Sequence, residues 1–329
     1  MRNLALASIF LFTAACGGDS GDGGTGDPDA AIPGSVSVVW GPITVPAGTE
    51  DTRCVIKKLG NETQLRVGSI HNVLGATSHH FIIYRIDDQP EQATPYACNP
   101  FTDTLDPAKG APLMITQKSE ETLTLPDGVA FSLAPNQTVR LEMHFINASD
   151  SDSEVTATST FVPIADADFR HEADFLFIGN VDVSVPPGEA TLGPTYFPLP
   201  TDLADSKFFA LTGHEHQWGT DVSVATTTGS AGSDTLVYDL PNFNWDEPET
   251  VYHDPPFEVP GGGGFRFTCA WNNLSGTTVG FGEGADDEMC FFWAYYYPSK
   301  GARVCAHTDQ FGGIDVCCPG NPTICNNLF

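Results

Sequence analysis

The chain has 329 residues, of which 41% are hydrophobic, and its formal net charge is −28 at pH 7. This length is enough for two domains of ordinary size, each with its own core. The acidic balance repels nucleic acids and anionic lipid headgroups, so we exclude nucleic-acid binding and any membrane contact other than a lipid anchor. The 33 glycines and 25 prolines, without long helical periodicity, favour an all-β chain with many turns.

Residues 1–16, MRNLALASIFLFTAAC, have one arginine, an apolar run too short to span a bilayer, and small residues before Cys16. Residues 17–35 follow as a flexible, self-repelling tether rich in glycine and aspartate. We predict a lipoprotein-type signal peptide with lipid on Cys16, although Thr13 stands where this motif usually has leucine. An ordinary signal peptide is the alternative. The protein would be exported and lipid-anchored in a bacterial cell envelope. Gly17 after Cys16 favours the outer membrane or cell surface.

Eight further cysteines give an even number, and in an exported protein disulfides are the default. The adjacent pair in the tail DVCCPGNPTIC predicts a small cross-linked cap, with metal binding by this tail as the alternative. The disulfide candidates are Cys54, Cys98, Cys269, Cys290, Cys305, Cys317, Cys318 and Cys325.

Strand-like runs separated by Gly, Pro, Asn and Asp recur along the rest of the chain. Their spacing fits two β-sandwiches of similar size with a boundary near residues 163–168. We predict an N-terminal sandwich at 36–165, a C-terminal sandwich at 166–309 and a Cys-rich tail at 310–329, in a monomer. The clearer strands are expected at Val36–Trp40, Leu65–Ile70, Phe81–Tyr84, Val139–Ile146, Phe175–Ile178, Phe208–Trp218, Leu236–Leu240, Phe265–Trp271 and Met289–Tyr297.

Three histidines of the N-terminal half could bind one metal. In VRLEMHFI, alternation places His144 and Glu142 on the polar face of a strand, where a ligand could open onto a cleft. His79 and His80 in TSHHFIIYR would point to opposite faces of a regular strand, so a shared metal requires a bulge there. Each signal alone is weak, because an exposed strand histidine is usually only solvated. Three imidazoles would suit copper, zinc, iron or nickel alike.

The C-terminal half offers a second set. In LTGHEHQWGTDVSV, His214 and His216 are two residues apart in an expected strand, so both imidazoles would point the same way. In GEGADDEMCFFWAYYYP, Met289 shares a face with Phe291 and Trp293. A methionine that starts an aromatic strand is usually core filler. As a ligand, however, a thioether selects soft metals, chiefly monovalent copper, over zinc.

The order of these segments, HH, an HF strand, HxH, then DEMC followed by YYYP, resembles that of the copper type II ascorbate-dependent monooxygenases, the family of dopamine β-hydroxylase and peptidylglycine α-hydroxylating monooxygenase. The stretches SHHFIIYR, LEMHFIN, GHEHQWG, FTCAWNN and DEMCFFWAYYYP carry the resemblance, which covers residues 36–307. It implies two tandem jelly-roll β-sandwich domains and two copper ions per chain. The electron-transferring copper would be held by His79, His80 and His144. The oxygen-binding, catalytic copper would be held by His214, His216 and Met289.

The resemblance also implies the disulfides Cys54–Cys98 and Cys269–Cys290. The usual partner of Cys305 is missing, so Cys305 could pair within the tail instead. By the same resemblance the chain would be a copper-dependent monooxygenase that hydroxylates a C–H bond of a small organic substrate, and the predicted signal peptide would make it a lipoprotein member of the family. It would use O2 and a one-electron reductant such as ascorbate. Two sites are needed because oxygen insertion takes two electrons and each copper carries one.

Other functions remain open. The main alternative is a non-catalytic copper-binding or copper-delivery lipoprotein on the same fold. A structural or sugar-binding sandwich with incidental histidines is a third possibility. A zinc hydrolase fits poorly, because the HxH strand lacks a nearby third nitrogen ligand and an obvious base.

Departures from the family pattern bear on the substrate. Peptide-amidating relatives carry Arg where Thr212 stands, and Asn and Tyr where Phe291 and Trp293 stand. A peptide carboxylate would therefore lack its anchor. We expect a pocket lined by Thr212, Phe291 and Trp293, with Glu142 adding negative charge. Such a pocket would take a neutral or cationic small molecule, with aromatic compounds among the candidates.

Overall fold

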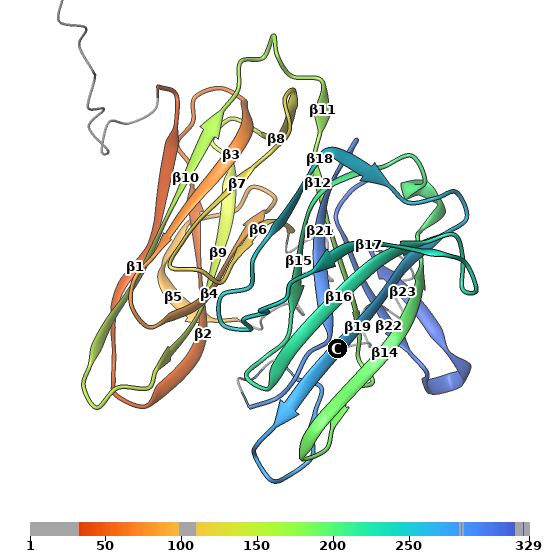
Figure 1. Ribbon diagram of the computed structural model, residues 1–329. Coiled ribbons are helices and arrows are strands. Elements are labelled where there is room, and N and C mark those ends of the chain that lie inside the picture. The colour runs from red at the N-terminus through yellow and green to blue at the C-terminus, as the bar shows by residue number, and fades with distance from the viewer. Residues whose placement is uncertain (1–32, 99–109, 283, 285, 320–324, 326–329) are drawn as a thin grey trace, which may run out of the picture. The chain divides into compact units, whose positions relative to one another are not determined.

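The structure, a computed structural model, describes residues 33–98, 110–282, 284, 286–319 and 325. The predicted signal peptide, Cys16 and the tether up to residue 32 lie outside the described residues. Residues Gly34–Phe329 form one compact unit, and it is built of strands joined by turns (Figure 1). The predicted all-β class is therefore confirmed. Among the described residues, no helix is long and apolar enough to cross a membrane.

The first half of this unit, β1 to β11, contains two sheets with apolar side chains between them. One sheet has the order β1-β10-β3-β8-β11, with β7 on β3, and the other has the order β5-β2-β9-β4-β6. The strands of the first sheet are β1 (Val36–Val45), β3 (Leu65–Leu74), β7 (Glu120–Thr124), β8 (Val129–Leu133), β10 (Ser153–Pro163) and β11 (His171–Glu172). Those of the second sheet are β2 (Thr49–Lys58), β4 (Ser78–Arg85), β5 (Gln92–Ala97), β6 (Ala111–Thr116) and β9 (Thr138–Asn147).

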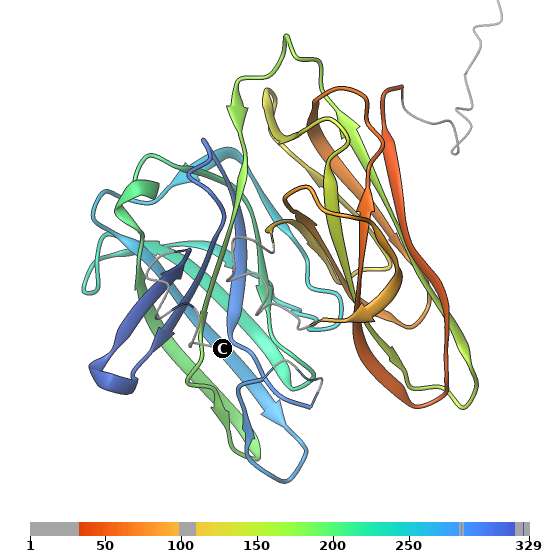
Figure 2. The same ribbon diagram turned by 180° about the vertical axis from the view of Figure 1, so that it is seen from behind.

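The second half, β12 to β23, also has two large sheets, and Figures 1 and 2 show them from opposite sides. The first has the order β18-β15-β21-β12-β22-β23, the second β14-β19-β16-β17, and β13 pairs with β20. The first sheet contains β12 (Asp174–Asn180), β15 (Lys207–His214), β18 (Val251–Glu258), β21 (Phe291–Tyr297), β22 (Arg303–Thr308) and β23 (Ile314–Cys318). The others are β13 (Ser184–Val185), β14 (Gly188–Pro198), β16 (Gly219–Thr227), β17 (Asp234–Asp239), β19 (Gly264–Asn273) and β20 (Val279–Gly280). Short 3-10 turns lie at Thr201–Leu203 and Gln310–Gly312.

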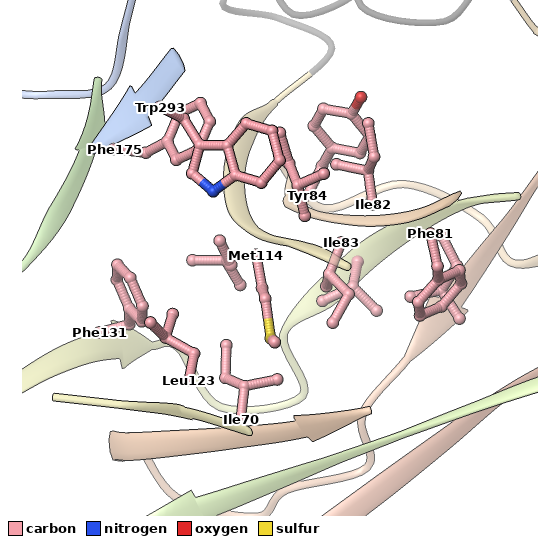
Figure 3. Close-up of a cluster of buried hydrophobic side chains, with 14 of the residues drawn as sticks. Ile70, Phe81, Ile82, Ile83, Tyr84, Met114, Leu123, Phe131, Phe175 and Trp293 are labelled. Carbon is pink, nitrogen blue, oxygen red and sulfur yellow. The ribbon is translucent and has the colours of Figure 1, made fainter. Parts of the chain in front are cut away.

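Strand β21 is buried on both faces, and its alternating side chains belong to two different cores. Phe292 and Tyr296 pack between the two sheets of the second half. Trp293 and Tyr295 point the other way, into a cluster that contains Met114 of β6. Figure 3 shows Trp293 in this cluster, with Phe175 of β12 and Met114. One face of the β21 sheet therefore packs against the first half, where apolar burial stabilises the contact.

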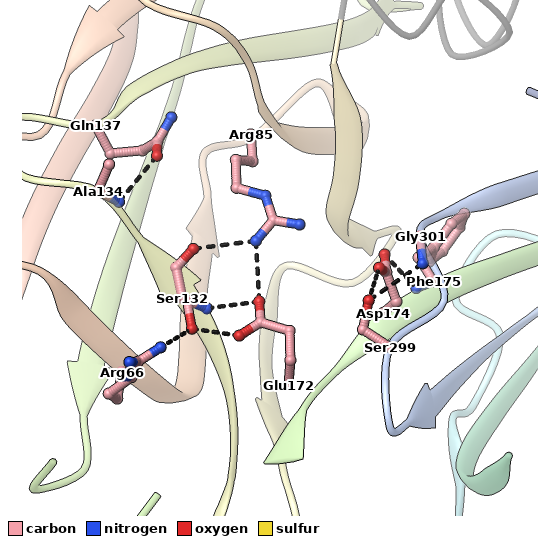
Figure 4. Close-up of polar contacts among 10 residues, drawn as sticks. All are labelled: Arg66, Arg85, Ser132, Ala134, Gln137, Glu172, Asp174, Phe175, Ser299 and Gly301. Carbon is pink, nitrogen blue, oxygen red and sulfur yellow. Dashed lines mark hydrogen bonds and ion pairs between the residues drawn. The ribbon is translucent and has the colours of Figure 1, made fainter. Parts of the chain in front are cut away.

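Polar groups hold the connection between the halves (Figure 4). Glu172 accepts hydrogen bonds from the backbone N–H of Ser132, at 2.9 Å, and from the Arg85 guanidinium, at 3.0 Å. Two residues later, Asp174 accepts a hydrogen bond from the Ser299 hydroxyl at 2.6 Å. Burial raises the pKa of Asp174. These charge-assisted bonds fix the chain as it passes from β11 to β12.

All eight cysteines predicted to form disulfides are paired. The disulfides are Cys54–Cys98, Cys269–Cys290, Cys305–Cys317 and Cys318–Cys325. The two pairs implied by the family resemblance are confirmed, and Cys305 does pair within the tail. Cys305 and Cys317 lie opposite each other where β22 pairs with β23.

Two predicted strand boundaries near the histidines and the methionine are wrong. The run expected at Phe208–Trp218 is broken, because β15 ends at His214 and a turn precedes β16. In this turn the N–H of Gly219 donates to the carbonyl oxygen of His216 at 2.9 Å. The strand expected from Met289 begins only at Phe291. Both departures have one cause, the buried carboxylate of Glu288, which binds the backbone of both segments.

Candidate metal centre

The structure brings His79, His80 and His144 together. One ligand nitrogen of each lies within 4.8 Å of the other two, and all three residues are at most 9% exposed. His80 of β4 lies opposite His144 of β9, and the register between these strands shifts between Ser78 and His80. His79 is thus the extra residue of a bulge. The predicted irregularity is confirmed, and it lets adjacent histidines approach one point.

Carboxylates outside this cluster orient its imidazoles. His144 Nε2 lies 3.0 Å from Glu50 Oε1, and because a carboxylate only accepts, Nε2 carries the hydrogen. The lone pair of His144 is then on Nδ1, which lies 3.4 Å from His80 Nδ1. His79 Nδ1 lies 3.4 Å from Asp246 Oδ1. Nitrogens that bind one ion at about 2.0–2.1 Å lie within about 4 Å of each other. The 3.4 Å between Nδ1 of His144 and Nδ1 of His80 lies in this range, so these two nitrogens fit one metal ion, with His79 beside them.

The polar face of β9 is closed, although the alternation in VRLEMHFI predicted that it opens onto a cleft. Arg140 is 4% exposed and Glu142 is fully buried. The Tyr84 hydroxyl donates to Glu142 Oε2 at 2.9 Å, and the Arg140 guanidinium lies 4.0 Å from the centre of the Tyr84 ring. These partners compensate the polar groups and allow their burial. Glu142 Oε1 lies 4.0 Å from His80 Nε2, so Glu142 belongs beside the first histidine cluster.

The second pair of histidines also meets, although not on a regular strand. His214 ends β15, His216 lies in the following turn, and their ring centroids are 5.2 Å apart. His214 Nδ1 lies 3.0 Å from Gln117 Oε1, and His216 Nδ1 lies 3.0 Å from the Asp287 carbonyl oxygen. Both oxygens only accept, so each Nδ1 carries a hydrogen and each Nε2 carries a lone pair. Both imidazoles are thus set to bind a metal through Nε2.

A buried carboxylate, Glu288, ties the turn after His216 to Met289. It accepts hydrogen bonds from the backbone N–H groups of His216 at 3.0 Å, Trp218 at 2.8 Å and Met289 at 3.3 Å. It also accepts from the Trp271 indole at 2.8 Å. These bonds replace strand pairing, which explains why β15 ends early and β21 begins late. Glu288 was not among the predicted site residues, although its place in DEMC, directly before the methionine, was a usable signal.

Three further features bear on this second set. Met289 is 2% exposed, and the Cys269–Cys290 disulfide follows it directly. Glu215, between the two histidines, is fully buried. Burial raises the pKa of Glu215 well above its ordinary value, and the nearby Glu288 carboxylate raises it further. His216 and Met289 therefore lie on two chain segments that buried groups hold in place.

Burial favours the neutral form of four of these imidazoles. It lowers the pKa of His80 and His214 well below the ordinary value, and that of His216 to about 4. Burial also lowers the pKa of His144. Charge on His79 would lower the pKa of His216 further. The two histidine sets thus share one electrostatic neighbourhood, and a neutral imidazole is the form that binds metal.

The second half reaches the first through residues 245–252, which we call the bridging segment; it covers the end of the connection from β17 and the first two residues of β18 (Figure 1). The Trp245 ring lies 5.7 Å from the His79 ring, between centroids. Thr250 donates to Glu121 Oε1 at 3.0 Å, and the Tyr252 hydroxyl donates to the Thr122 carbonyl at 2.9 Å. No motif in the sequence indicates this segment.

Three of the predicted pocket residues lie beside His214. Thr212 is opposite Trp293 in the β15–β21 pair, and the Trp293 and His214 rings are 6.0 Å apart. Phe291 is opposite His214 and stacks on Phe177 with centroids 4.8 Å apart. All three predicted residues are at most 2% exposed. The fourth, Glu142, is not with them. The aromatic residues pack in the core cluster instead of lining an open surface.

Residues 193–311 match the family described as copper type II ascorbate-dependent monooxygenase, C-terminal domain. This region of the chain belongs to the copper type II ascorbate-dependent monooxygenase family. The matched residues include His214, His216 and Met289, whereas His79, His80 and His144 lie outside the match.

Comparison with whole proteins adds no functional information. A search of curated proteins found no match. PNGase F, a glycosylasparaginase from Flavobacterium meningosepticum, is similar with a TM-score of 0.37 and 10% identity, over 86% of this chain and 99% of that one. A tail fiber protein from an E. coli phage has a TM-score of 0.22 and 9% identity, over 81% of this chain and 40% of that one. Neither likeness is close enough to support an argument.

Proposed function

We propose that the protein is a copper-dependent monooxygenase that hydroxylates a C–H bond of a small organic substrate with O2 and a one-electron reductant such as ascorbate. The observation that carries this proposal is the pairing of two donor sets. In the family-matched region, His214 and His216 both present Nε2. The backbone N–H groups of His216 and Met289 both donate to the Glu288 carboxylate. The three-imidazole cluster around His79 lies in the other half.

The donor chemistry suits copper at both sets. Imidazole nitrogen binds copper in either oxidation state, and a thioether favours the monovalent ion. Two bound coppers would supply, one each, the two electrons that insertion of one oxygen atom consumes. The chain's own residues fix the donors: Glu50 holds the hydrogen of His144 on Nε2, and Gln117 holds that of His214 on Nδ1. Burial of both sets excludes water, which would otherwise compete for open coordination positions.

The residues beside His214 support a neutral or cationic substrate. Thr212 offers a hydroxyl where an arginine would anchor a peptide carboxylate, and it lies 2.9 Å from the Thr250 hydroxyl. Thr250 in turn donates to the Glu121 carboxylate. A carboxylate-bearing ligand at this position would approach an acid instead of a cation, which opposes its binding.

A copper-binding or copper-delivery protein on the same fold is the alternative function. The same six candidate ligands serve it. The observation that favours it is the burial of Thr212, Phe291 and Trp293, which leaves at most 2% of each residue exposed. In either case, four disulfides support our proposal that the protein is exported, because disulfides persist in oxidising compartments.

Turnover with isotopically heavy O2 tests the proposed function. Residues 34–329 would be loaded with copper, reduced with ascorbate and exposed to heavy O2 with a panel of small aromatic and amine compounds. We expect at least one compound to gain a single heavy oxygen atom by mass spectrometry. Met289→Ile should abolish this gain. Protein that holds two coppers but transfers no heavy oxygen to any compound would contradict the monooxygenase and favour the copper-binding alternative.

A further inference from the structure

We propose that Gln117 is a positioning residue that couples the orientation of the two histidine sets. Its side-chain amide would set the tautomer of His214 with one end and hold the bridging segment against His79 with the other. The inference rests on the proposed function only in taking both sets as copper ligands. The contacts on which it depends are all between residues of this chain.

Gln117 directly follows β6 in the first half and is 6% exposed. Its Oε1 lies 3.0 Å from His214 Nδ1, at the end of β15. Its Nε2 donates to the carbonyl oxygen of Trp245, at 3.5 Å, in the bridging segment. One side chain of the first half therefore contacts two separate segments of the second half.

The bridging segment completes the connection to the other set. The Trp245 ring packs on the His79 ring with centroids 5.7 Å apart. The next residue, Asp246, places Oδ1 3.4 Å from His79 Nδ1, and this contact with His79 lowers the pKa of Asp246. A continuous series of contacts thus runs from His214 through Gln117 and residues 245–246 to His79. None of the three connecting residues is itself a candidate ligand.

The amide is the side-chain group that this position requires. It offers an acceptor and a donor at one planar end. The acceptor keeps the hydrogen of His214 on Nδ1 and so leaves Nε2 for a metal, the role that outer partners of metal-binding histidines usually play. The donor satisfies the Trp245 carbonyl. A carboxylate would keep the first bond and lose the second, and an aliphatic side chain would lose both.

Gln137 provides a matched control. It is also a buried glutamine, 9% exposed, and its Nε2 donates to the carbonyl oxygens of Ile86 and Thr138, at 2.8 Å each. Its Oε1 accepts from the N–H of Ala134 at 3.0 Å. Gln137→Leu removes at least as many amide bonds as Gln117→Leu, but it touches neither histidine set. A merely structural contribution of a buried amide would appear in both variants.

The test reads the histidine rings in copper-free protein. Nuclear magnetic resonance of chains with isotope-labelled ring nitrogens reports the tautomer of each histidine, and His214→Gln and His79→Gln assign the two signals. In wild type, we expect the hydrogen of His214 on Nδ1. Gln117→Glu should keep this tautomer but shift the His79 signal. Gln117→Leu should change both signals, and Gln137→Leu neither. Should Gln117→Leu not fold, Gln117→Asn, one methylene too short to span both partners, replaces it.

Copper binding separates this inference from the proposed function. Gln117→Leu should weaken copper retention at the His214 set by roughly tenfold to a hundredfold, the usual effect of losing an outer partner. If wild type binds no copper but the ring signals respond as expected, the proposed function fails and the positioning role stands. Unchanged His214 and His79 signals in Gln117→Leu, or equal changes in Gln137→Leu, would overturn the inference.

Discussion

Glu121 allows a quantitative test of the contact between the first half and the bridging segment. This residue of β7 accepts a hydrogen bond from the Thr250 hydroxyl at 3.0 Å. Burial raises its pKa to about 7, from an ordinary value of 4.5, although Thr250 and Lys118 oppose the rise. Glu121→Gln keeps an acceptor for Thr250 and removes the ionisation. The substitution therefore removes one titratable proton and leaves the acceptor for Thr250 in place.

The sign and size of the effect follow from linkage. The folded protein holds this proton more tightly than the unfolded chain, so its contribution to stability is complete below pH 4.5 and is lost as the pH rises through about 7. At about 1.4 kcal/mol per pH unit, this interval corresponds to about 3 kcal/mol. The Gln variant lacks this loss. From acidic to weakly alkaline buffer, the free energy of unfolding of Glu121→Gln should therefore rise by about 3 kcal/mol relative to that of wild type.

Urea denaturation of both proteins across this pH range measures the difference, because every other group titrates in both. Glu120→Gln is the matched control: the Glu120 side chain is next in sequence but 69% exposed, and this variant should follow wild type in its pH dependence. If the stability difference between Glu121→Gln and wild type is the same at both ends of the range, Glu121 ionises as a solvated acid. The buried contact with the bridging segment would then be wrong.

Further predictions address the groups around the two histidine sets. Glu288→Ala should lower the free energy of unfolding by at least about 3 kcal/mol, because it strands several buried N–H donors at about 1–3 kcal/mol each; a loss below about 1 kcal/mol in urea denaturation would contradict this. Glu50→Gln should weaken copper at the first set by about tenfold in chelator competition and leave the second set unaffected. Replacing Cys305 and Cys317 together by serine should lower the free energy of unfolding by about 2–4 kcal/mol, measured by thermal unfolding. The copper content, measured by metal analysis, should not change, and a lost copper would refute the purely structural role of this disulfide.

Local patterns in the sequence were sufficient where strand alternation decides the structure. The alternation predicted from Met289 onward correctly placed Trp293 on one face and Cys290, just before β21, on the other, towards Cys269. The adjacent pair His79-His80 predicted a bulge, because only an irregular strand lets both side chains approach one metal. These conclusions required only the period of a strand.

Long-range partners explain what the sequence did not show. The expected strand through His216 was wrong because Glu288, far along the chain, binds the N–H groups that a neighbouring strand would otherwise pair. The polar face of β9 was wrongly expected to be open. The hydroxyl that donates to Glu142 belongs to Tyr84 on another strand, and the sequence around Glu142 does not show this partner. Gln117 gave no signal at all, since its partners His214 and Trp245 are contributed by the other half.

Copper content per chain tests the central claim most directly. Residues 34–329 would be loaded with copper, desalted and analysed by metal mass spectrometry, beside Met289→Ile and His144→Ala. Wild type should retain two coppers per chain. Each variant should retain one firmly and lose the other, and chelator titration of the variants should show that different sites remain. One copper or none in wild type would contradict the two-site chemistry on which the proposed monooxygenase depends.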